Sequence, residues 1–305
     1  MAETVAAVVV TFNRKILLGE CLDALFAQTT PVDKIILIDN ASTDGTSEFL
    51  AAQGYLNNEK IDYLRLPENT GGAGGFCAGV KRGYEGGYDW LWLMDDDTEC
   101  HRDALDHLLA ATKIPSLEVG FVCSKVLWSD GSVHRMNIPE TARFVNNIAF
   151  NQYDEMAVSL VPSSSFVSCL VSSKAVYSVG LPIKDMFIWS DDVEYTYRIT
   201  RANYLGVYAR LSIVIHKTKE NYNANIIQDK NNNLWKYKYG ARNDVYTIRV
   251  NNGYIRSFMY VLKRLIIINS KILIYRRGGV FNALVINSCG AVSGLFYYPK
   301  IESVR

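Results

Sequence analysis

The 305-residue sequence predicts an α/β protein with a mostly parallel, doubly wound sheet and a helical extension at its C-terminal end. Four largely apolar runs, at 6–12, 34–39, 61–67 and 88–94, are typical of strands that a parallel sheet buries on both faces. Segments with helical periodicity separate these runs. Strands that alternate with helices form parallel strands joined by crossover helices, so the first hundred residues are expected to build such a sheet.

The elements of this first part follow one another in a regular order. After the first strand, the apolar residues between Ile16 and Phe26 fall on one side of a helix. The second strand leads through a loop into a helix that is expected to be capped near Ser42 or Asp44. The third strand is followed by the glycine-rich segment 69–76, which turns into another helix before the fourth strand.

The rest of the chain has a less regular pattern. Between 118 and 172, short alternating strands predominate without clear helices. A helix is expected to begin near Asp191 and to be followed by a strand at 209–216. The asparagine-rich stretch 220–233 predicts a loop, and two or three helices complete the chain.

Composition and charge exclude several classes of protein. A hydrophobic content of 49% and a charged content of 21% are typical of a globular chain rather than a disordered one. The formal net charge of +1 does not provide the broad basic surface of a general nucleic-acid-binding protein. Six scattered cysteines without CxxC spacing, and no visible targeting segment, predict a reducing, cytoplasmic location.

The C-terminal part has a basic character that the net charge conceals, because residues 254–305 contain eight lysines and arginines but only one acidic residue, Glu302. Along the first helix of this part the basic residues recur about every seven positions, at Arg256, at Lys263 or Arg264, and at Lys271. The uncharged stretch 278–299 is long enough to cross a bilayer, for which roughly 20 residues are needed, but polar residues and glycines interrupt it. We therefore expect these helices to lie on an anionic membrane surface or to form a homo-oligomer contact.

Polar and acidic residues follow the end of each predicted strand. They are Thr11, Asn13 and Arg14; Asp39 and Asn40; Glu68 and Asn69; and Asp95, Asp96 and Asp97. Open α/β sheets bind their ligands at the carboxyl ends of the strands. The sequence therefore predicts a ligand site at this edge of the sheet.

The run "DDD" at 95–97 indicates a metal site at that edge. Adjacent carboxylates repel one another unless a cation holds them together, and Mg²⁺ or Mn²⁺ prefers such oxygen ligands beside a substrate diphosphate. Successive side chains of a strand alternate, so Asp95 and Asp97 can face one way and Asp96 the other. A solvated acidic turn is the alternative, and it is less favoured because a buried strand delivers the acids to the ligand edge.

The segment "NTGGAGGF" at 69–76 resembles a dinucleotide-binding fingerprint without matching it. It follows the third strand rather than the first, and its spacing differs from GxGxxG, which argues against a Rossmann dehydrogenase. Glycines that open a helix still allow the backbone to approach a sugar or phosphate closely. Tight packing of the helix on the sheet explains any individual glycine equally well.

Together and in this order, "VVVTFNR", "LIDNASTDGT", "NTGGAGGF" and "LMDDD" resemble the nucleotide-sugar domain of family 2 glycosyltransferases with the GT-A fold, over about residues 5–217. The later segment "GLPIKDMFIWSDDVEYTYR" resembles galactofuranosyltransferases that build bacterial cell-wall galactans and O-antigens. The resemblance implies an inverting, metal-dependent hexosyltransferase with Mn²⁺ or Mg²⁺. Its donor would be UDP-galactofuranose, and its acceptor a lipid-linked glycan at the inner face of the cell membrane.

The same resemblance implies how the chain is divided. A GT-A catalytic domain would occupy 1–225, with nucleotide-sugar binding in about 1–100 and the acceptor and catalytic half in 101–225. The helical region 226–305 would contact the membrane surface or a second copy of the chain.

Residue roles on the donor side follow from the matched motifs. The implied nucleotide-sugar contacts are Thr11, Arg14, Asp39, Asn69, Gly72, Asp95 and Asp96. Among these, Thr11 and Asp39 would contact the uracil, and Asp96 would meet the ribose or the diphosphate. Asp95 and Asp97 would bind the metal together with His216, for which a satisfied histidine at a strand end is the alternative.

On the acceptor side, Asp192 in "WSDDVEY" would be the catalytic base, and Asp191 would assist by binding acceptor hydroxyls. Inverting transfer needs a base on the face opposite the departing nucleotide, where it takes a proton from the attacking hydroxyl. Trp189 would stack on a sugar ring, and Ser164 or Ser165 would bond sugar hydroxyls unless they belong to a plain buried strand.

Other residues near these motifs are expected to have structural roles. Glu194 and Arg198 lie on the helix that follows the acids, and they are expected to be structural partners rather than catalytic residues. His134 is expected on a surface hairpin, while Arg242 and Asn243 are expected to fix a helix against the core.

Two alternatives to galactofuranose transfer remain open. Rhamnosyltransferases that use dTDP-rhamnose share the early motifs. A nucleotide-sugar-binding scaffold that has lost catalysis is an alternative of a different class, but it would not need to keep Asp192 and the three metal ligands.

Overall fold

The structure of the chain is a computed structural model that describes residues 3–115 and 117–304. These residues form a nine-stranded sheet with the order β3-β2-β1-β4-β10-β6-β11-β5, in which β9 also pairs with β11. Its strands are β1 (Val5–Thr11), β2 (Lys34–Asp39), β3 (Ile61–Arg65), β4 (Trp90–Asp95), β5 (Thr98–Cys100), β6 (Val119–Leu127), β9 (Val158–Leu160), β10 (Cys169–Ser172) and β11 (Leu205–His216). β7 (Phe144–Val145) and β8 (Ile148–Ala149) form a separate pair.

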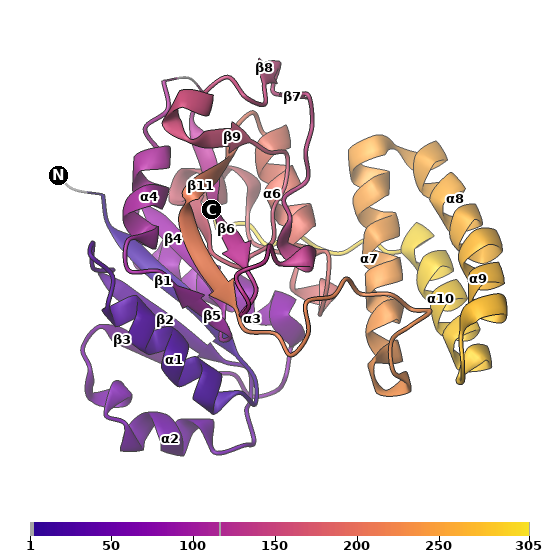
Figure 1. Cartoon of the computed structure of the whole chain (residues 1–305), viewed down its shortest axis with the longest axis horizontal. Coiled ribbons are helices and arrows are strands. Elements are labelled where there is room, and N and C mark those ends of the chain that lie inside the picture. Colours follow the sequence, from indigo (N-terminus) through magenta and orange to yellow (C-terminus); the bar gives the residue numbers. More distant parts are fainter. Residues whose placement is uncertain (1–2, 116, 305) are drawn as a thin grey trace.

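The sheet combines a parallel half with a mixed half. β3, β2, β1 and β4 run parallel to one another, as the alternation of strands and helices predicts. β10 then runs antiparallel between β4 and β6, whereas β11 is parallel to β6. The predicted α/β class, with a mostly parallel sheet and C-terminal helices, is confirmed (Figure 1).

Helices cover both faces of the sheet. They are α1 (Lys15–Phe26), α2 (Thr46–Ala52), α3 (Gly71–Glu85), α4 (Ala104–Ala111), α5 (Ser173–Val179) and α6 (Asp191–Arg201). Short 3₁₀ turns lie at Tyr55–Asn57, Arg135–Asn137, Asp154–Met156, Lys184–Met186 and Asn231–Asn233. In β1 the side chains alternate, so that Val9 joins a core with α1 and α4 while Val8 joins a core with α3, α5 and α6.

Two local details differ from the sequence expectations. α2 begins at Thr46 after Gly45, which has a left-handed φ of 83° and no side-chain cap, so neither Ser42 nor Asp44 caps it. Asp44 instead accepts a hydrogen bond from the amide of Lys15 at 3.3 Å, which ties this loop to the start of α1. The sequence pattern also does not indicate α5, because its apolar residues continue directly from β10.

The C-terminal helices form a group beside the sheet (Figure 1). They are α7 (Leu234–Asn252), α8 (Tyr254–Lys263), a π-helical segment (Arg264–Ile268), α9 (Asn269–Tyr275) and α10 (Val280–Leu295). α10, which contains most of the uncharged stretch, packs closely on α7. A Cβ added to Gly290 would lie 2.6 Å from the carbonyl oxygen of Lys238, so glycine is needed at this crossing. No helix in the described ranges is both long and apolar enough to cross a membrane.

The chain after α10 returns to the sheet (Figure 1). The amide of Leu181 donates to the carbonyl oxygen of Glu302 at 2.9 Å, and Lys81 on α3 forms an ion pair with the Glu302 carboxylate at 2.6 Å. The segment around Glu302 therefore packs against the part of the chain that carries the acidic motifs.

Candidate active site

The pairing of β5 with β11 brings the acidic run and His216 together. β4 ends at Asp95, and after a turn β5 runs antiparallel to the end of β11, with Thr98 opposite His216. The amide of Lys217 also donates to the carbonyl oxygen of Asp97 at 2.8 Å. Residues that are far apart in the sequence thus share one edge of the sheet.

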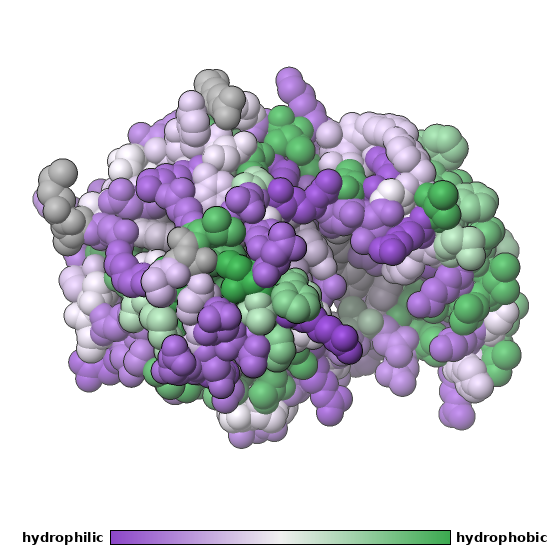
Figure 2. Space-filling view, turned by 90° about the horizontal axis from the view of Figure 1, so that it is seen from above, coloured by the Kyte–Doolittle hydropathy of each residue, from purple (hydrophilic) through white to green (hydrophobic). Residues whose placement is uncertain are grey.

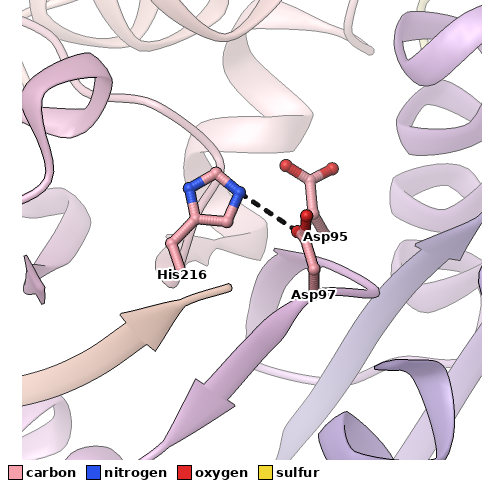
Figure 3. Close-up of side chains that lie close together, drawn as sticks. All are labelled: Asp95, Asp97 and His216. Carbon is pink, nitrogen blue, oxygen red and sulfur yellow. Dashed lines mark ion pairs between the residues drawn. The ribbon is translucent and has the colours of Figure 1, made fainter. Parts of the chain in front are cut away.

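Asp95, Asp97 and His216 form a group that can hold a metal ion (Figure 3). Their ligand atoms all lie within 4.8 Å of one another. Nε2 of His216 lies 3.1 Å from Oδ1 of Asp97, yet this buried oxygen accepts no well-formed hydrogen bond from any described residue. The group thus offers two carboxylates, one of them with an unsatisfied oxygen, and an imidazole. These are suitable ligands for a divalent cation such as Mg²⁺ or Mn²⁺.

Neighbouring charges shift the pKa values of all three side chains in this group. Burial opposes ionisation of Asp97, but His216 and Arg14 outweigh it and lower the pKa of the carboxyl group. Burial likewise opposes the charged form of His216, but the neighbouring Asp97 and Asp95 raise the pKa of the imidazole. Burial and the charge of Asp97 raise the pKa of Asp95 to about 6. A cation between these side chains would favour the ionised carboxylates and the neutral imidazole.

The orientation of His216 is fixed by Asn137, which the sequence analysis did not identify. Nδ1 of His216 lies 2.8 Å from Oδ1 of Asn137, so Nδ1 carries the proton of the neutral ring and Nε2 faces Asp97. Asn137 in turn donates to Oγ of Ser165 at 2.9 Å. A hydrogen bond of this kind sets the tautomer that a metal ligand needs.

The expectation that His134 lies on a surface hairpin is wrong. Its side chain is fully buried, its ring centroid is 4.5 Å from that of His216, and its Nε2 lies 2.8 Å from Oγ1 of Thr218. Burial, with a contribution from His216, lowers the pKa of His134 to about 4. His134 is therefore a neutral packing partner of His216, which the hairpin signal in its own segment could not reveal.

Asp96, Arg14 and Thr11 form the adjoining part of the site. Oγ1 of Thr11 donates to Oδ2 of Asp96 at 2.7 Å, and Arg14 forms ion pairs with Asp96 at 3.4 Å and with Asp97. Burial raises the pKa of Asp96 to about 7 despite the nearby guanidinium. Arg14 is half-exposed, so it can also reach an anionic ligand at this edge.

Asp39 lies at the end of β2 and is fully buried. Its oxygens accept hydrogen bonds from the hydroxyl of Tyr63 at 2.7 Å and from the amide of Ser42 at 2.8 Å. The hydroxyl of Thr11 is likewise bonded within the protein. The predicted contact of Asp39 and Thr11 with a nucleobase therefore stays a prediction.

The glycine-rich segment contains one glycine with a clear steric requirement. Gly71 has a left-handed φ of 72°, and a Cβ there would lie 1.9 Å from the carbonyl oxygen of Phe187. A Cβ on Gly72, by contrast, would meet no atom within 4 Å. Asn69 is hydrogen-bonded to the first residue of α3, because its Oδ1 accepts a hydrogen bond from the amide of Gly71 at 2.8 Å. The same oxygen accepts a hydrogen bond from Nδ2 of Asn40 at 3.1 Å.

Asp191 and Asp192 occupy the first turn of α6, as the sequence predicts. Asp191 is buried, and burial together with the charge of Asp192 raises its pKa well above the ordinary value. Asp192 is half-buried and accepts a hydrogen bond from the amide of Val193 at 2.8 Å. Desolvation and the charge of Asp95 raise the pKa of Asp192 to about 6.

The predicted acceptor residues pack against different elements. The amide of Ser164 donates to Oγ1 of Thr196 on α6 at 3.0 Å, while Ser165 contacts Asn137 and thereby the metal-ligating group. The ring of Trp189 packs edge-on against Tyr237, with centroids 4.9 Å apart, and lies against Gly240. Trp189 is partly exposed, and its predicted stacking on a sugar ring stays a prediction.

Comparison with known proteins relates this arrangement to sugar transfer. The sequence pattern of Glycosyl transferase family 2 matches residues 6–163. The galactofuranosyltransferase GlfT1 of Mycobacterium tuberculosis is 34% identical over 210 residues, a stretch that covers 66% of this chain and 66% of that protein.

Two solved structures share the fold. The first, described as GalNAc-T7 with UDP, GalNAc and Mn²⁺, superposes with a TM-score of 0.63 at 14% identity, covering 99% of this chain and 55% of that one. The second, the mannosyltransferase PcManGT from Pyrobaculum calidifontis in complex with GDP-Man and Mn²⁺, gives a TM-score of 0.57 at 16% identity and covers 98% of this chain and 76% of that one. The chain thus spans just over half of the first of these proteins.

Proposed function

This chain belongs to glycosyltransferase family 2, and from that premise we propose that it transfers galactofuranose from UDP-galactofuranose to a glycan, with inversion at the anomeric carbon. The acceptor is a lipid-linked glycan of a bacterial cell-surface polysaccharide, such as an O-antigen, capsule or galactan. The catalytic domain is 1–225, and the helical region 226–305 carries the contact surface.

The observation that carries this proposal is the convergence of Asp95, Asp97 and His216 at the carboxyl edge of the sheet. The ligand atoms of these three residues all lie within 4.8 Å of one another, and desolvation together with the charge of Asp95 raises the pKa of Asp192 to about 6. A donor sugar bound between this group and Asp192 would expose its diphosphate to the group and its anomeric carbon to Asp192. The 34% identity to a galactofuranosyltransferase supports the choice of donor.

In this mechanism Asp192 accepts the proton of the acceptor hydroxyl as that oxygen attacks the anomeric carbon. Asp191, beside it, orients acceptor hydroxyls, and Arg14 stabilises the negative charge of the diphosphate. Asp95, Asp97 and His216 would hold Mn²⁺ or Mg²⁺, which neutralises charge on the departing nucleotide when bound. The presence of Mn²⁺ in both solved structures of similar fold supports a metal at this place.

A donor assay tests the proposal. The protein is incubated with Mn²⁺, a small panel of galactan-like acceptors and either UDP-galactofuranose, UDP-galactopyranose or dTDP-rhamnose, and products are identified by mass spectrometry. We expect UDP release and one added hexose only with UDP-galactofuranose. Transfer from dTDP-rhamnose, or only from another UDP-sugar, would remove the galactofuranose assignment. UDP binding without turnover of any donor would favour a scaffold instead.

The outer face of the C-terminal helices supports the membrane part of the proposal. Figure 2 shows hydrophobic side chains gathered over this end of the molecule. Exposed hydrophobic residues of this region include Ile255, Phe258, Met259, Ile274, Phe281 and Phe296. Exposed basic side chains lie among them, at Arg256, Lys263, Lys271 and Arg277. An apolar face with basic side chains among its residues is complementary to an anionic leaflet.

The alternative between Lys263 and Arg264 in the basic stripe is resolved by packing. Arg264 turns inward, where its Nε donates to Oδ1 of Asn287 at 2.9 Å and its guanidinium lies 3.5 Å from Asp244. Lys263 is exposed and continues the stripe between Arg256 and Lys271.

Replacing Ile255 and Phe258 together with serine is expected to weaken binding to phosphatidylglycerol-containing vesicles at least about tenfold, because burying one such side chain contributes roughly 1.5–3 kcal/mol. Co-sedimentation measures the binding, and Phe144→Ser is the matched control, since Phe144 is 63% exposed on β7. If the double variant binds vesicles as the wild type does but dissociates an oligomer in light scattering, the face is a homo-oligomer contact and the membrane assignment is wrong.

A further inference from the structure

The loop that leads into Asp191 and Asp192 has an unusual backbone. Phe187, Trp189 and Ser190 have positive φ angles of 66°, 66° and 65°. Residues with a Cβ adopt this left-handed region at a cost in free energy, so neighbouring groups must hold them there. The loop would otherwise relax, and the first turn of α6 would move with it.

One side chain of α7 holds this loop from the other side. The fully buried amide of Asn243 donates from Nδ2 to the carbonyl oxygens of Met186 at 2.9 Å, Trp189 at 2.8 Å and Ile188 at 3.2 Å. An NH₂ group has only two protons, so one of the three contacts is shared. The acceptors are carbonyl groups of the loop at positions 186, 188 and 189, and only Ser190 separates the last of them from Asp191.

The neighbours of Asn243 complete the arrangement. Nε of Arg242 donates to Oδ1 of Asn243 at 3.0 Å, which sets the orientation of the amide. A second nitrogen of Arg242 donates to the carbonyl oxygen of Asp185 at 2.7 Å. Asp244 accepts a hydrogen bond from the hydroxyl of Ser190 at 2.7 Å. Three successive residues of one helix therefore bind the loop from its beginning to its end.

The glycine-rich segment contacts the same loop at Phe187. The carbonyl oxygen of Phe187 accepts from the amide of Ala73 at 3.2 Å, at the point where Gly71 leaves no room for a Cβ. The loop is thus fixed between α3, which belongs to the donor side, and α7, which belongs to the C-terminal helices.

We propose that Asn243 is a positioning residue that holds Asp192, and Asp191 with it, in the geometry needed for transfer. The inference rests on the proposed role of Asp192 as the base. It also assigns to the C-terminal helices a part in catalysis, because α7 carries the residue that keeps the acids in place. Small displacements of a reacting group lower turnover strongly while leaving ligand binding at a separate cluster intact.

The experiment compares Asn243→Ala with Asn287→Ala. Asn287 is a matched control, since it is also fully buried and its amide bonds Asn269 at 2.8 Å and the Arg264 carbonyl oxygen at 3.1 Å, away from the loop. Asn243→Ala is expected to lower kcat by about 10–100-fold with little change in donor KM, and to speed amide hydrogen exchange at 186–193. Asn287→Ala is expected to leave both kcat and that exchange unchanged.

A milder variant covers the case in which Asn243→Ala does not fold. Ser190→Ala removes only the hydrogen bond to Asp244, and it is expected to change kcat and exchange in the same direction by about two- to fivefold. Unchanged exchange at 186–193 in the folded variants would show that Asn243 does not hold the loop. Faster exchange with the kcat of the control would show that the loop does not position the base. The exchange arm does not depend on the donor, so a wild-type enzyme that fails to transfer galactofuranose refutes the proposed function separately.

Discussion

Asp192→Asn is expected to lower kcat by about 10³-fold while the affinity for UDP stays within twofold of the wild type. Asparagine has nearly the same size and can keep the contact with the Val193 amide, but it cannot accept the proton of the acceptor hydroxyl. General base catalysis contributes about 10²–10⁴-fold to such steps. UDP binding is unaffected because the nucleotide is assigned to the other acidic cluster. Steady-state kinetics and calorimetric UDP titration measure the two quantities.

The pH dependence gives a second readout of the same residue. The base must be ionised to accept a proton, and desolvation with the charge of Asp95 raises the pKa of Asp192 to about 6. Turnover is therefore expected to rise with pH through about 6 and to be lost below it. Saturating Mn²⁺ keeps Asp95 and Asp97 ionised and offsets part of the Asp95 charge, so the midpoint of this rise is expected at or below about pH 6. The wild-type profile should contain this acidic limb, and the residual activity of Asp192→Asn should lack it.

The matched control is Asp185→Asn, which changes an exposed carboxylate on the turn before the loop. It should leave kcat and the pH profile as they are. Wild-type turnover in Asp192→Asn would contradict the assignment of the base, and loss of UDP affinity in that variant would place Asp192 in the donor site instead.

The sequence predicts those parts of the fold and site that depend on local pattern. Buried strands and the polar residues after them are visible in the chain, so the parallel half of the sheet and the position of Asp95–Asp97 at its edge follow directly. The start of α6 at Asp191 is equally local, because acidic residues favour the first turn of a helix. These features need no knowledge of the packing.

The parts that sequence reasoning missed depend on contacts between distant segments. Asn137 bonds His216, but an isolated asparagine gives no signal of that partner. Asn243 fixes its helix as expected, but the loop carbonyls that it bonds before Asp191 cannot be identified from the sequence. His134 lies in a segment with turn residues, yet it is buried because β11 brings His216 beside it. The steric demand on Gly71 likewise comes from Phe187, so only the three-dimensional structure separates it from its neighbour Gly72.

Removal of the metal is expected to stop turnover reversibly without unfolding the protein. The proposed ligands Asp95, Asp97 and His216 lie at or beside the ends of paired strands, and the pairing of β5 with β11 fixes their register without a cation. Treatment with EDTA should therefore abolish transfer while the circular dichroism spectrum is retained, and added Mn²⁺ should restore activity. Unfolding on chelation would instead identify a structural metal, and full activity in EDTA would exclude a catalytic one.

Asp97→Asn is expected to weaken Mn²⁺ binding roughly 100-fold, since loss of even an outer partner of a metal ligand costs about 10–100-fold. Electron paramagnetic resonance of free Mn²⁺ measures the affinity. Glu99→Gln is the control, because Glu99 lies two positions further along the strand region and forms an ion pair with Lys217 rather than facing His216.

In the wild type, Mn²⁺ affinity should also increase with pH above the ordinary imidazole pKa of about 6.5, because Asp97 and Asp95 raise the pKa of His216 and the ring must lose its proton to bind metal. His216→Ala should bind less Mn²⁺ at every pH and should lose this dependence. If Mn²⁺ affinity does not depend on pH in the wild type, or if Asp97→Asn binds the ion as well as Glu99→Gln does, the ion is held elsewhere, and the assignment of Asp95, Asp97 and His216 as its ligands is wrong.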